Sequence, residues 1–231
     1  MEAAGRRETT DKVTRSGKCI VVGAGDLTVD LPERARDDFW IAVDGGLGHC
    51  KALGVKADLI LGDFDSVSPE DAKAVQTLER EAPERIFRLP TKKDDTDMLA
   101  ALKEGIRRGY RDFWIYGGTG GRLDHTLANI QCLLYLKKNG AAGYLVDEDG
   151  MIFAIVDETV EFPQGRKGCL SLFSLTEESV GVTIRGMKYP LEKAVLRNDF
   201  PVGISNEFTG EKAAVSVEKG QLVCMVRPVR E

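Results

Sequence analysis

The sequence predicts an α/β fold, a mostly parallel sheet flanked by helices, followed by a smaller all-β sandwich domain. Up to about residue 146, short apolar runs of strand length alternate with segments of helical periodicity. Beyond residue 150, apolar and polar residues alternate with a period of two, and glycine and proline punctuate the segments. The polar stretch 147–150 separates the two patterns. We therefore expect an α/β catalytic domain over 18–147 and a β-sandwich domain over 150–228.

Short apolar runs in the first part are expected to form buried strands, and they lie at residues 19–22, 39–43, 59–61, 86–89, 113–116 and 144–146. Helical patterns lie between them. One covers 69–80, with Ser68 as a candidate N-cap and Pro69 at the first helical position. Others cover 98–108 and 126–138, and glycines follow both. Strands that alternate with helices predict parallel pairing.

The second part contains short strands only. Period-two alternation predicts strands at 170–175, 180–185 and 213–217, and a hairpin-like turn at 218–220 leads into another at 222–226. Short strands separated by glycine and proline are typical of a sandwich.

Composition narrows the function classes. The chain has 231 residues, 42% hydrophobic and 30% charged, with a net charge of -5. An acidic balance argues against nucleic acid as a partner, although a metal ion can mediate between acids and nucleotide phosphates. The five cysteines are scattered without a Cys-x-x-Cys pair, which favours a reducing compartment. Residues 1–18 lack the apolar core of a signal peptide, and no apolar run reaches membrane-spanning length, so we expect a cytoplasmic protein.

Polar segments follow five of the predicted strands. They lie at residues 23–26, 44–46, 62–66, 92–97 and 117–125. Ligands of an open parallel sheet bind beyond the carboxyl ends of its strands. We therefore expect all five segments to converge on one edge of the sheet.

Acidic residues dominate two of these segments: Asp63 and Asp65 in one, Asp94 and Asp97 in the other. Asp63 and Asp65 alternate in an extended loop, whereas Asp94 and Asp97 are three apart at a helix start and can share a face. Such acids repel one another without a cation, and Mg²⁺ needs only one or two carboxylates besides phosphate oxygens. Alternatively, Asp-x-Asp is a solvated turn, and Asp94 and Thr96 cap the helix. The expected convergence favours a metal site.

Glycines dominate two further segments. Residues 44–46, Asp-Gly-Gly, precede a helix and can present backbone N–H groups to a phosphate or a base. Residues 117–121 hold four glycines, which permits close backbone approach to a ligand. The segment 23–25 lacks the third glycine of a dinucleotide fingerprint, and no P-loop motif occurs.

Charged side chains follow the second glycine segment. Arg122 can fork onto phosphate oxygens, and Asp124 and His125 open the next helix. His125 is either a site residue or a capping or packing histidine. His49 receives no catalytic role, and Lys93 is either a phosphate contact or a surface ion-pair partner. Acidic loops that hold a magnesium-bound nucleoside triphosphate for phosphoryl transfer account for all these features.

The motifs, taken together and in this order, resemble the thiamine pyrophosphokinase family. The matching segments are 44–46, 62–66, 93–97, 120–125 and the late Ser-Asn-Glu at 205–207, which span the chain from about Lys18 to Val226. The resemblance implies transfer of a diphosphoryl group from ATP to thiamine, giving thiamine diphosphate and AMP. It also implies a homodimer whose active site lies between subunits, with ATP on the α/β domain and thiamine against the partner's sandwich.

The resemblance assigns roles by motif. Magnesium would be held by Asp63, Asp65, Asp94 and Asp97. The catalytic groups would be Asp65, Asp97, Arg122 and Asp124. ATP would contact Asp44, Gly45, Gly46, Gly120, Gly121, Arg122 and His125. Thiamine would contact Tyr189, Ser205 and Asn206, with the Tyr189 ring on the pyrimidine. Other family members carry glutamine at the position of His125, so His125 is not expected to be an obligatory base.

Alternatives stay open at several points. The proton of the thiamine hydroxyl would pass to Asp97 or Asp124. Tyr189 is either a thiamine platform or an aromatic that covers the sandwich core. The rival functions are a diphosphokinase for another hydroxymethyl substrate, such as a pterin, and a non-catalytic sensor of thiamine or a nucleotide.

Overall fold

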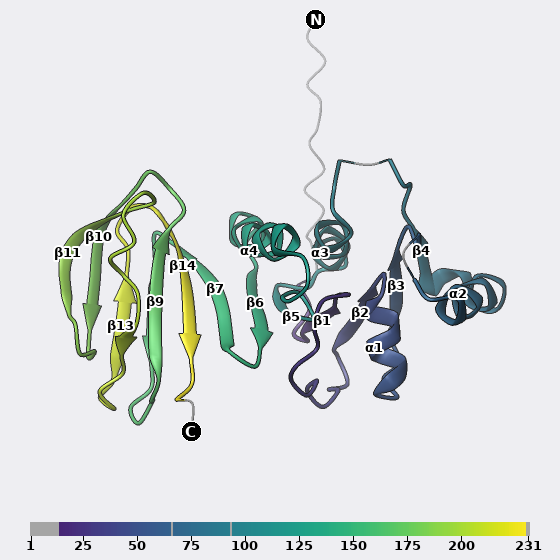
Figure 1. Ribbon diagram of the computed structural model, residues 1–231, viewed down its shortest axis with the longest axis horizontal. Coiled ribbons are helices and arrows are strands. Elements are labelled where there is room, and N and C mark those ends of the chain that lie inside the picture. Colours follow the sequence, from purple (N-terminus) through teal and green to yellow (C-terminus); the bar gives the residue numbers. More distant parts are fainter. Residues whose placement is uncertain (1–13, 66, 93, 230–231) are drawn as a thin grey trace, which may run out of the picture.

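The computed structural model describes residues 14–65, 67–92 and 94–229, so Ser66 and Lys93 of two predicted motifs lie outside the described residues. The described residues form a ten-stranded sheet with the order β12-β9-β14-β7-β6-β5-β1-β2-β3-β4, and a four-stranded sheet with the order β11-β10-β13-β8 (Figure 1). The predicted fold class, a mostly parallel α/β sheet followed by an all-β sandwich, is confirmed.

The elements of the first half are β1 (Cys19–Val22), β2 (Phe39–Val43), α1 (Gly46–Ala52), β3 (Leu59–Gly62), α2 (Pro69–Glu81), the 3₁₀ helix η1 (Pro83–Arg85), β4 (Ile86–Arg88), α3 (Asp97–Arg107), β5 (Asp112–Tyr116), α4 (Leu123–Lys138) and β6 (Ala142–Asp147). The second half contains β7 (Gly150–Val156), β8 (Thr159–Phe162), β9 (Cys169–Ser174), β10 (Glu178–Arg185), β11 (Leu191–Arg197), β12 (Asn206–Glu207), β13 (Ala213–Ser216) and β14 (Gln221–Arg227).

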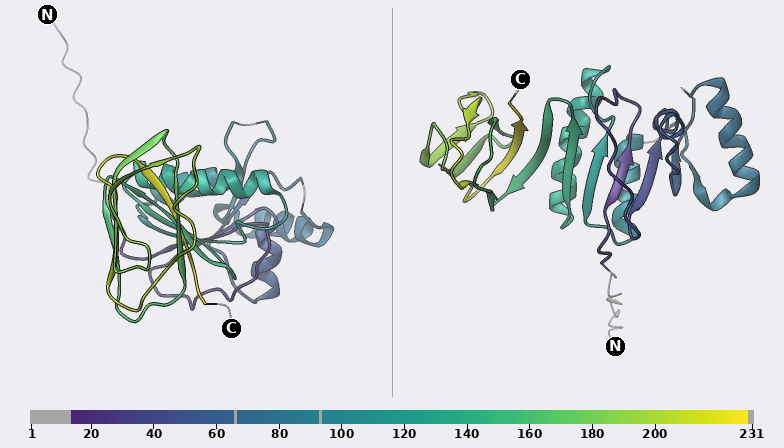
Figure 2. Two further views of the ribbon diagram at one scale, coloured as in Figure 1. Left: turned by 60° about the vertical axis from the view of Figure 1, so that its left-hand side comes forward. Right: turned by 90° about the horizontal axis from the view of Figure 1, so that it is seen from below.

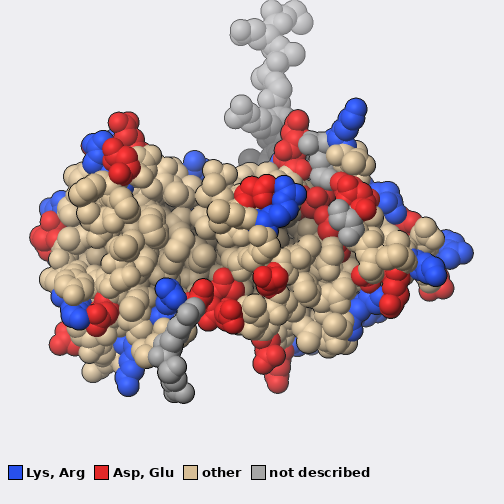
Figure 3. Space-filling model, viewed as in Figure 1, with Lys and Arg blue, Asp and Glu red and all other residues tan. Residues whose placement is uncertain are grey.

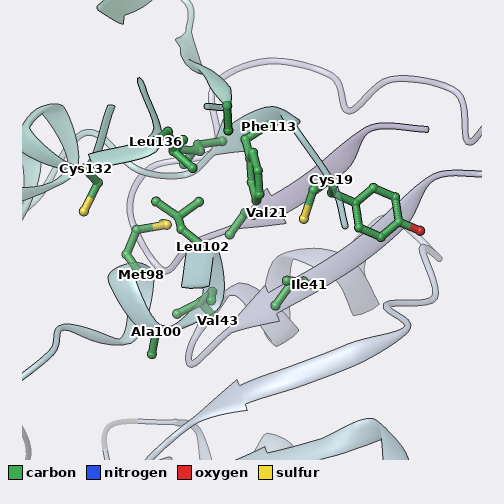
Figure 4. Close-up of a cluster of buried hydrophobic side chains, with 14 of the residues drawn as sticks. Cys19, Val21, Ile41, Val43, Met98, Ala100, Leu102, Phe113, Cys132 and Leu136 are labelled. Atoms are coloured by element: carbon green, nitrogen blue, oxygen red, sulfur yellow. The ribbon is translucent and has the colours of Figure 1, made fainter. Parts of the chain in front are cut away.

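Helices cover both faces of the parallel strands. On one face, α3 and α4 bury residues such as Leu102 and Leu136 against Val21 and Phe113 (Figure 4). On the other face, α1 and α2 pack against the alternate strand residues, among them Trp40. Strands buried on both faces read as continuous apolar runs, which is why they were recognisable in the sequence.

Side-chain caps fix where two helices begin. The Ser68 hydroxyl accepts from the Asp71 N–H at 3.1 Å, which confirms the predicted cap of α2. Thr96 likewise accepts from the Leu99 N–H at 3.1 Å and starts α3 at Asp97. Helix α4 begins at Leu123, three residues before the predicted start at residue 126.

The second half is a sandwich joined to the first by the larger sheet. Strand β7 pairs antiparallel with β6, so the sheet continues through the turn at 147–150. The four-stranded sheet packs against this extension and buries Val182 and Val215 against Leu170 and Leu222. Figure 2 shows helices only at the parallel end of the molecule. The predicted domain limits, 18–147 and 150–228, thus meet at a turn between paired strands and remain a prediction.

In the described part of the chain, no helix is long and apolar enough to cross a membrane.

Glu104 is a buried acid of α3 that pairs with two arginines at the end of the same helix. It is 8% exposed and accepts from Arg107 at 2.6 Å and from Arg108 at 2.7 Å. The hydrogen bonds from Arg107, and then those from Arg108, lower the pKa of Glu104 despite its burial.

We expect Glu104→Gln to lower the free energy of unfolding by about 1 kcal/mol at pH 7, about 3 °C in Tm. Because the folded pKa is depressed, this stabilisation exists above the unfolded value of about 4.3 and is lost as pH falls through the folded value. Thermal unfolding of both proteins between pH 3 and pH 8 measures the difference. The exposed Glu81→Gln is the control. An equal difference at all pH values would contradict the charged role of Glu104.

Candidate functional site

The predicted polar segments lie along one edge of the sheet. Strands β1 to β6 pair in parallel, so their carboxyl ends share an edge, here termed the carboxyl rim. The segments that follow β1 to β5 therefore lie on this rim, as the sequence predicts. Figure 3 shows acidic side chains over both halves of the molecule, including patches over the middle and right, where the parallel half lies.

The strand order reverses at β1. The chain runs outward from β1 through β2, β3 and β4 and then returns to pair β5 with the other side of β1. Such a switch point is where open α/β sheets bind ligands. The loops after β1 and β5 meet there, because Gly25 donates to Gly117 O at 2.8 Å and Asp26 donates to Thr119 O at 2.9 Å.

Two further contacts set the shape of these loops. His49 Nε2 hydrogen-bonds the Gly25 carbonyl at 2.8 Å, so α1 supports the first loop. Gly120 has φ +79, and a Cβ atom there would lie 2.2 Å from Asp26 Oδ2. Both the backbone conformation and the lack of space therefore require glycine at position 120. Gly121 is exposed, and a Cβ atom there would meet nothing within 4 Å.

Asp44 lies at the centre of the acidic part of the rim. Its backbone has φ +46, and its N–H donates to Leu61 O at 3.0 Å. Its carboxylate accepts from the Phe64 N–H at 3.4 Å. A Cβ atom on Gly62 would lie only 1.8 Å from Asp44 Oδ1, so Gly62 leaves the space that Asp44 occupies. The family resemblance assigned Asp44 to ATP binding. In the structure, its side chain contacts the loop that carries Asp63 and Asp65.

Asp97 and Asp63 come close to Asp44. Burial raises the pKa of Asp44 to about 7, and the neighbouring carboxylates of Asp97 and then Asp63 add to the shift. Three acids from the ends of β2, β3 and the start of α3 thus share one region of the carboxyl rim. Carboxylates crowded together in this way favour a cation between them.

Arg88 holds the loop that carries Asp63 and Asp65. This β4 residue donates to Asp63 O at 3.2 Å and to Glu79 at 2.9 Å. Its guanidinium also lies 5.0 Å from the centre of the Phe64 ring. Phe64 has φ +61, an unfavourable backbone for an aromatic residue. Cation–π contact and hydrogen bonding together stabilise this conformation.

Asp94 and Asp97 do not share a helix face, which corrects the sequence prediction. Thr96 is the N-cap of α3 in an extended conformation, so the helix begins at Asp97. Asp94 therefore lies before the helix and is exposed, whereas Asp97 is half-buried in the first turn. The intervening Asp95 pairs with Lys103 at 2.7 Å.

No group of three or more His, Cys, Asp and Glu side chains among the described residues is arranged to hold a metal ion by itself. Magnesium is compatible with this arrangement, because it usually keeps waters and takes one or two carboxylates plus substrate phosphates. The crowding of Asp44, Asp63 and Asp97 supplies such carboxylates. The donor set therefore fits a magnesium ion that arrives with a phosphate ligand.

Arg122, Asp124 and His125 lie together at the start of α4. Arg122 Nη2 pairs with Asp124 Oδ2 at 2.6 Å, and the two side chains are 71% and 65% exposed. The hydrogen bond from Arg122 lowers the pKa of Asp124. The Asp124 carboxylate also accepts from the His125 N–H at 3.1 Å. Arg122 is thus largely exposed next to the glycine loop, with its Nε and Nη2 atoms bonded to Asp124.

A cavity of about 530 Å³ opens beside this helix start. Its lining includes the glycine loop, Leu123, Thr126, Asp26, the β6–β7 turn and Arg227. A second cavity of about 630 Å³ lies over β9, β12 and the end of β14, and its lining includes Ser205 and Arg227. Arg227 therefore lines both cavities.

The predicted thiamine contacts lie in the sandwich half. Tyr189 is 57% exposed in the connection between β10 and β11, so it does not cover the sandwich core. Ser205 is exposed, with φ +57, and Asn206 is 5% exposed. The Asn206 amide contacts the Tyr189 backbone, which brings two of the three residues together.

Arg88, His49 and Arg227 contribute to the site without a signal in the sequence. Arg88 stands in a short strand, His49 in a helix and Arg227 at a strand end. Their contacts join segments at least 24 residues apart. Local patterns carry no information about such contacts.

An open parallel sheet whose switch point carries glycine loops and clustered acids defines a phosphate-transferring α/β enzyme, here extended by a β-sandwich. The family model "Thiamin pyrophosphokinase, catalytic domain" matches residues 33–145, and "Thiamin pyrophosphokinase, vitamin B1 binding domain" matches residues 157–222. The chain belongs to the thiamine pyrophosphokinase family.

Individual relatives agree with this assignment. The thiamine pyrophosphokinase of Bacillus subtilis is 30% identical over 191 residues, which cover 82% of this chain and 86% of the relative. A Caenorhabditis elegans thiamin pyrophosphokinase is 22% identical over 184 residues, 74% of this chain and 72% of the relative.

Solved structures of the family share the fold. The crystal structure of the Bacillus subtilis enzyme matches with a TM-score of 0.82 and 28% identity, covering 93% of this chain and all of that one. The Geobacillus thermodenitrificans thiamin pyrophosphokinase matches with a TM-score of 0.79 and 27% identity, covering 93% of this chain and 98% of that one.

Proposed function

We propose that this enzyme transfers a diphosphoryl group from ATP to the hydroxyethyl oxygen of thiamine, giving thiamine diphosphate and AMP. The convergence of Asp44, Asp63 and Asp97 at the carboxyl rim carries the proposal. A chain that also matches a vitamin B1 binding domain has a second region for the acceptor alcohol. We assign catalysis to residues 18–147, and thiamine binding and dimerisation to residues 150–228.

In the proposed reaction, the thiamine hydroxyl oxygen attacks the β-phosphorus of ATP. The bond from the β-phosphorus to the oxygen that bridges it to the α-phosphorus breaks, and AMP leaves with that oxygen. The hydroxyl proton passes to a carboxylate, either Asp97 or Asp124. Positioning and charge neutralisation supply most of the acceleration in such transfers.

We assign ATP to the carboxyl rim. The backbone N–H groups of Gly45 and Gly46 at the start of α1, and the exposed backbone of Gly120 and Gly121, suit phosphates or a base. Arg122 and His125 flank the second loop. Magnesium, held by some of Asp63, Asp65, Asp94 and Asp97, would neutralise charge on the phosphates.

We also propose that two copies of the chain build each active site. Strands lie about 4.8 Å apart, so the steps across the sheet from β12, next to Tyr189, to β3, before Asp63, span on the order of 30 to 40 Å. Thiamine held at Tyr189 cannot reach phosphates held at Asp63 across that span. A homodimer that sets one sandwich against the partner's rim removes the gap.

An exposed row of apolar side chains supports the proposed dimer. Phe200, Val202 and Ile204 are 64%, 56% and 52% exposed and follow β11 at alternate positions. Leu123 and Leu127, 81% and 56% exposed, lie one helical turn apart at the start of α4. Apolar patches of this kind mark contact surfaces. We place the dimer in the cytoplasm, where the five free thiols would stay reduced, and we expect neither nucleic acid nor membrane as a partner.

AMP release from ATP tests the function directly. We expect AMP only when thiamine and Mg²⁺ are both present, with thiamine diphosphate formed in equal amount. A hydroxymethylpterin in place of thiamine is expected to give none. Turnover of the pterin alone would favour the rival diphosphokinase, and thiamine binding by calorimetry without AMP would favour a sensor.

Arg88→Ala is expected to raise the Mg²⁺ concentration for half-maximal activity about tenfold, because the Asp63 and Asp65 loop loses its hydrogen bond and its cation–π support. Manganese binding measured by electron paramagnetic resonance, with ATP present, should weaken in parallel. Arg185→Ala is the control, because its only described pairing is an exposed one with Glu192 at 3.7 Å. Unchanged metal dependence in Arg88→Ala would remove Arg88 from the support of the metal loop.

A further inference from the structure

Asn206 directs both ends of its side-chain amide at one neighbouring residue. Its Nδ2 donates to Tyr189 O at 2.7 Å, and its Oδ1 accepts from the Tyr189 N–H at 3.0 Å. The side chain is buried, with the residue 5% exposed. One amide donor and one acceptor are thus committed to the Tyr189 backbone, in the pattern that a neighbouring strand would provide.

The clamp extends a short region of backbone pairing. Lys188 donates its N–H to Glu207 O at 3.0 Å, and Met187 forms an isolated antiparallel bridge with Phe208. Asn206 continues this pairing by one residue through its side chain rather than its backbone. The backbone of Asn206 remains available to β9, with which β12 pairs.

Other contacts restrict the same tyrosine. Pro190 follows it and confines residue 189 to extended backbone conformations. Lys188 lies 5.5 Å from the centre of the Tyr189 ring and is fixed by an ion pair with Glu207 at 2.7 Å. Despite these restraints, the ring remains 57% exposed. A rigid backbone beneath an exposed aromatic ring is the arrangement of a preorganised binding surface.

We infer that Asn206 is a positioning residue, which acts on the substrate through Tyr189 and does not itself contact thiamine. The inference rests on the proposed use of thiamine, and it changes the role that the sequence motif assigned to Asn206. A flat cation stacks on the Tyr189 ring, and the buried Asn206 amide keeps that ring at a fixed height and angle. Lys188 beside the ring leaves the opposite side of the ring for the ligand.

A double-mutant cycle tests whether Asn206 acts on thiamine through Tyr189. Asn206→Ala in the natural background is expected to raise the KM for thiamine about tenfold and to leave kcat within about threefold, because two hydrogen bonds that orient the ring are lost. In a Tyr189→Ala background, the same substitution is expected to change the KM by less than about twofold. An equal change in both backgrounds would show that Asn206 acts independently of the ring and would overturn the inference.

Controls separate this inference from the proposed function. Absence of thiamine turnover in the unmutated enzyme would overturn the function itself. Asn198→Ala, an exposed asparagine of the same half, should leave the KM unchanged. If Asn206→Ala fails to fold, hydrogen exchange in the unmutated protein decides. The Tyr189 amide should be protected at least about a hundredfold, and exchange at the rate of an open amide would disprove the clamp.

Discussion

Asp97→Asn is expected to lower AMP production from ATP and thiamine by at least about a hundredfold while the protein keeps its fold. Asp97 begins α3 at the point where its carboxylate meets that of Asp44. Asparagine matches its size but removes the charge that a magnesium ion and a displaced proton require. Asp65→Asn is expected to give a comparable loss. Initial rates at saturating ATP, thiamine and Mg²⁺ measure the effect.

Asp95→Asn provides a matched control, because Asp95 lies two residues away in the same loop and pairs with Lys103. Its activity should stay within about twofold of the unmutated enzyme. The thermal unfolding midpoint of Asp97→Asn should not fall, because a carboxylate that repels Asp44 has been neutralised. Full activity in both Asp65→Asn and Asp97→Asn would rule out the metal assignment.

Much of the fold was predictable because its determinants are local. Buried parallel strands such as β1 and β3 are continuous apolar runs, and the Ser68-Pro69 start of α2 is a short-range signal. Strand β11 was missed because its exposed charged residues interrupt the alternation, and strand β8 was missed because its alternation covers only four residues. Strand β7 was missed because it is an almost continuous apolar run beside the 147–150 turn, where period-two alternation is absent.

The site was predictable only at the level of segments. The rule that parallel strands end at a common edge brought five loops together without any knowledge of side-chain contacts. The contact between Asp44 and Asp97 joins residues 53 positions apart and depends on the left-handed backbone of Asp44. The separation of Asp94 from Asp97 depends on Thr96, since the sequence offered both Asp94 and Thr96 as caps and the structure places Thr96 at the N-cap. Tertiary structure decided both.

Two variants that each have low activity at low thiamine concentration are expected to recover activity when they are combined in one dimer. Asp97→Asn removes the metal acid of the rim, and Tyr189→Ala removes the aromatic platform of the sandwich. If each active site joins one chain's rim to the partner's sandwich, a heterodimer of these variants holds one site with both substitutions and one with neither. The heterodimer, isolated through two different affinity tags, should show about half the activity of the unmutated dimer at low thiamine concentration.

The opposite result would place the whole site in one chain. The cavities beside Leu123 and beside Ser205 share Arg227 in their linings, so a site within one chain would have to extend past Arg227. A site of that kind leaves both heterodimer sites defective, and the activity would not exceed the mean of the two parent variants. Val202→Asp supplies the remaining control. A charge in the exposed apolar row should shift the protein to monomer in sedimentation, and under the shared-site arrangement AMP production should be lost with the dimer.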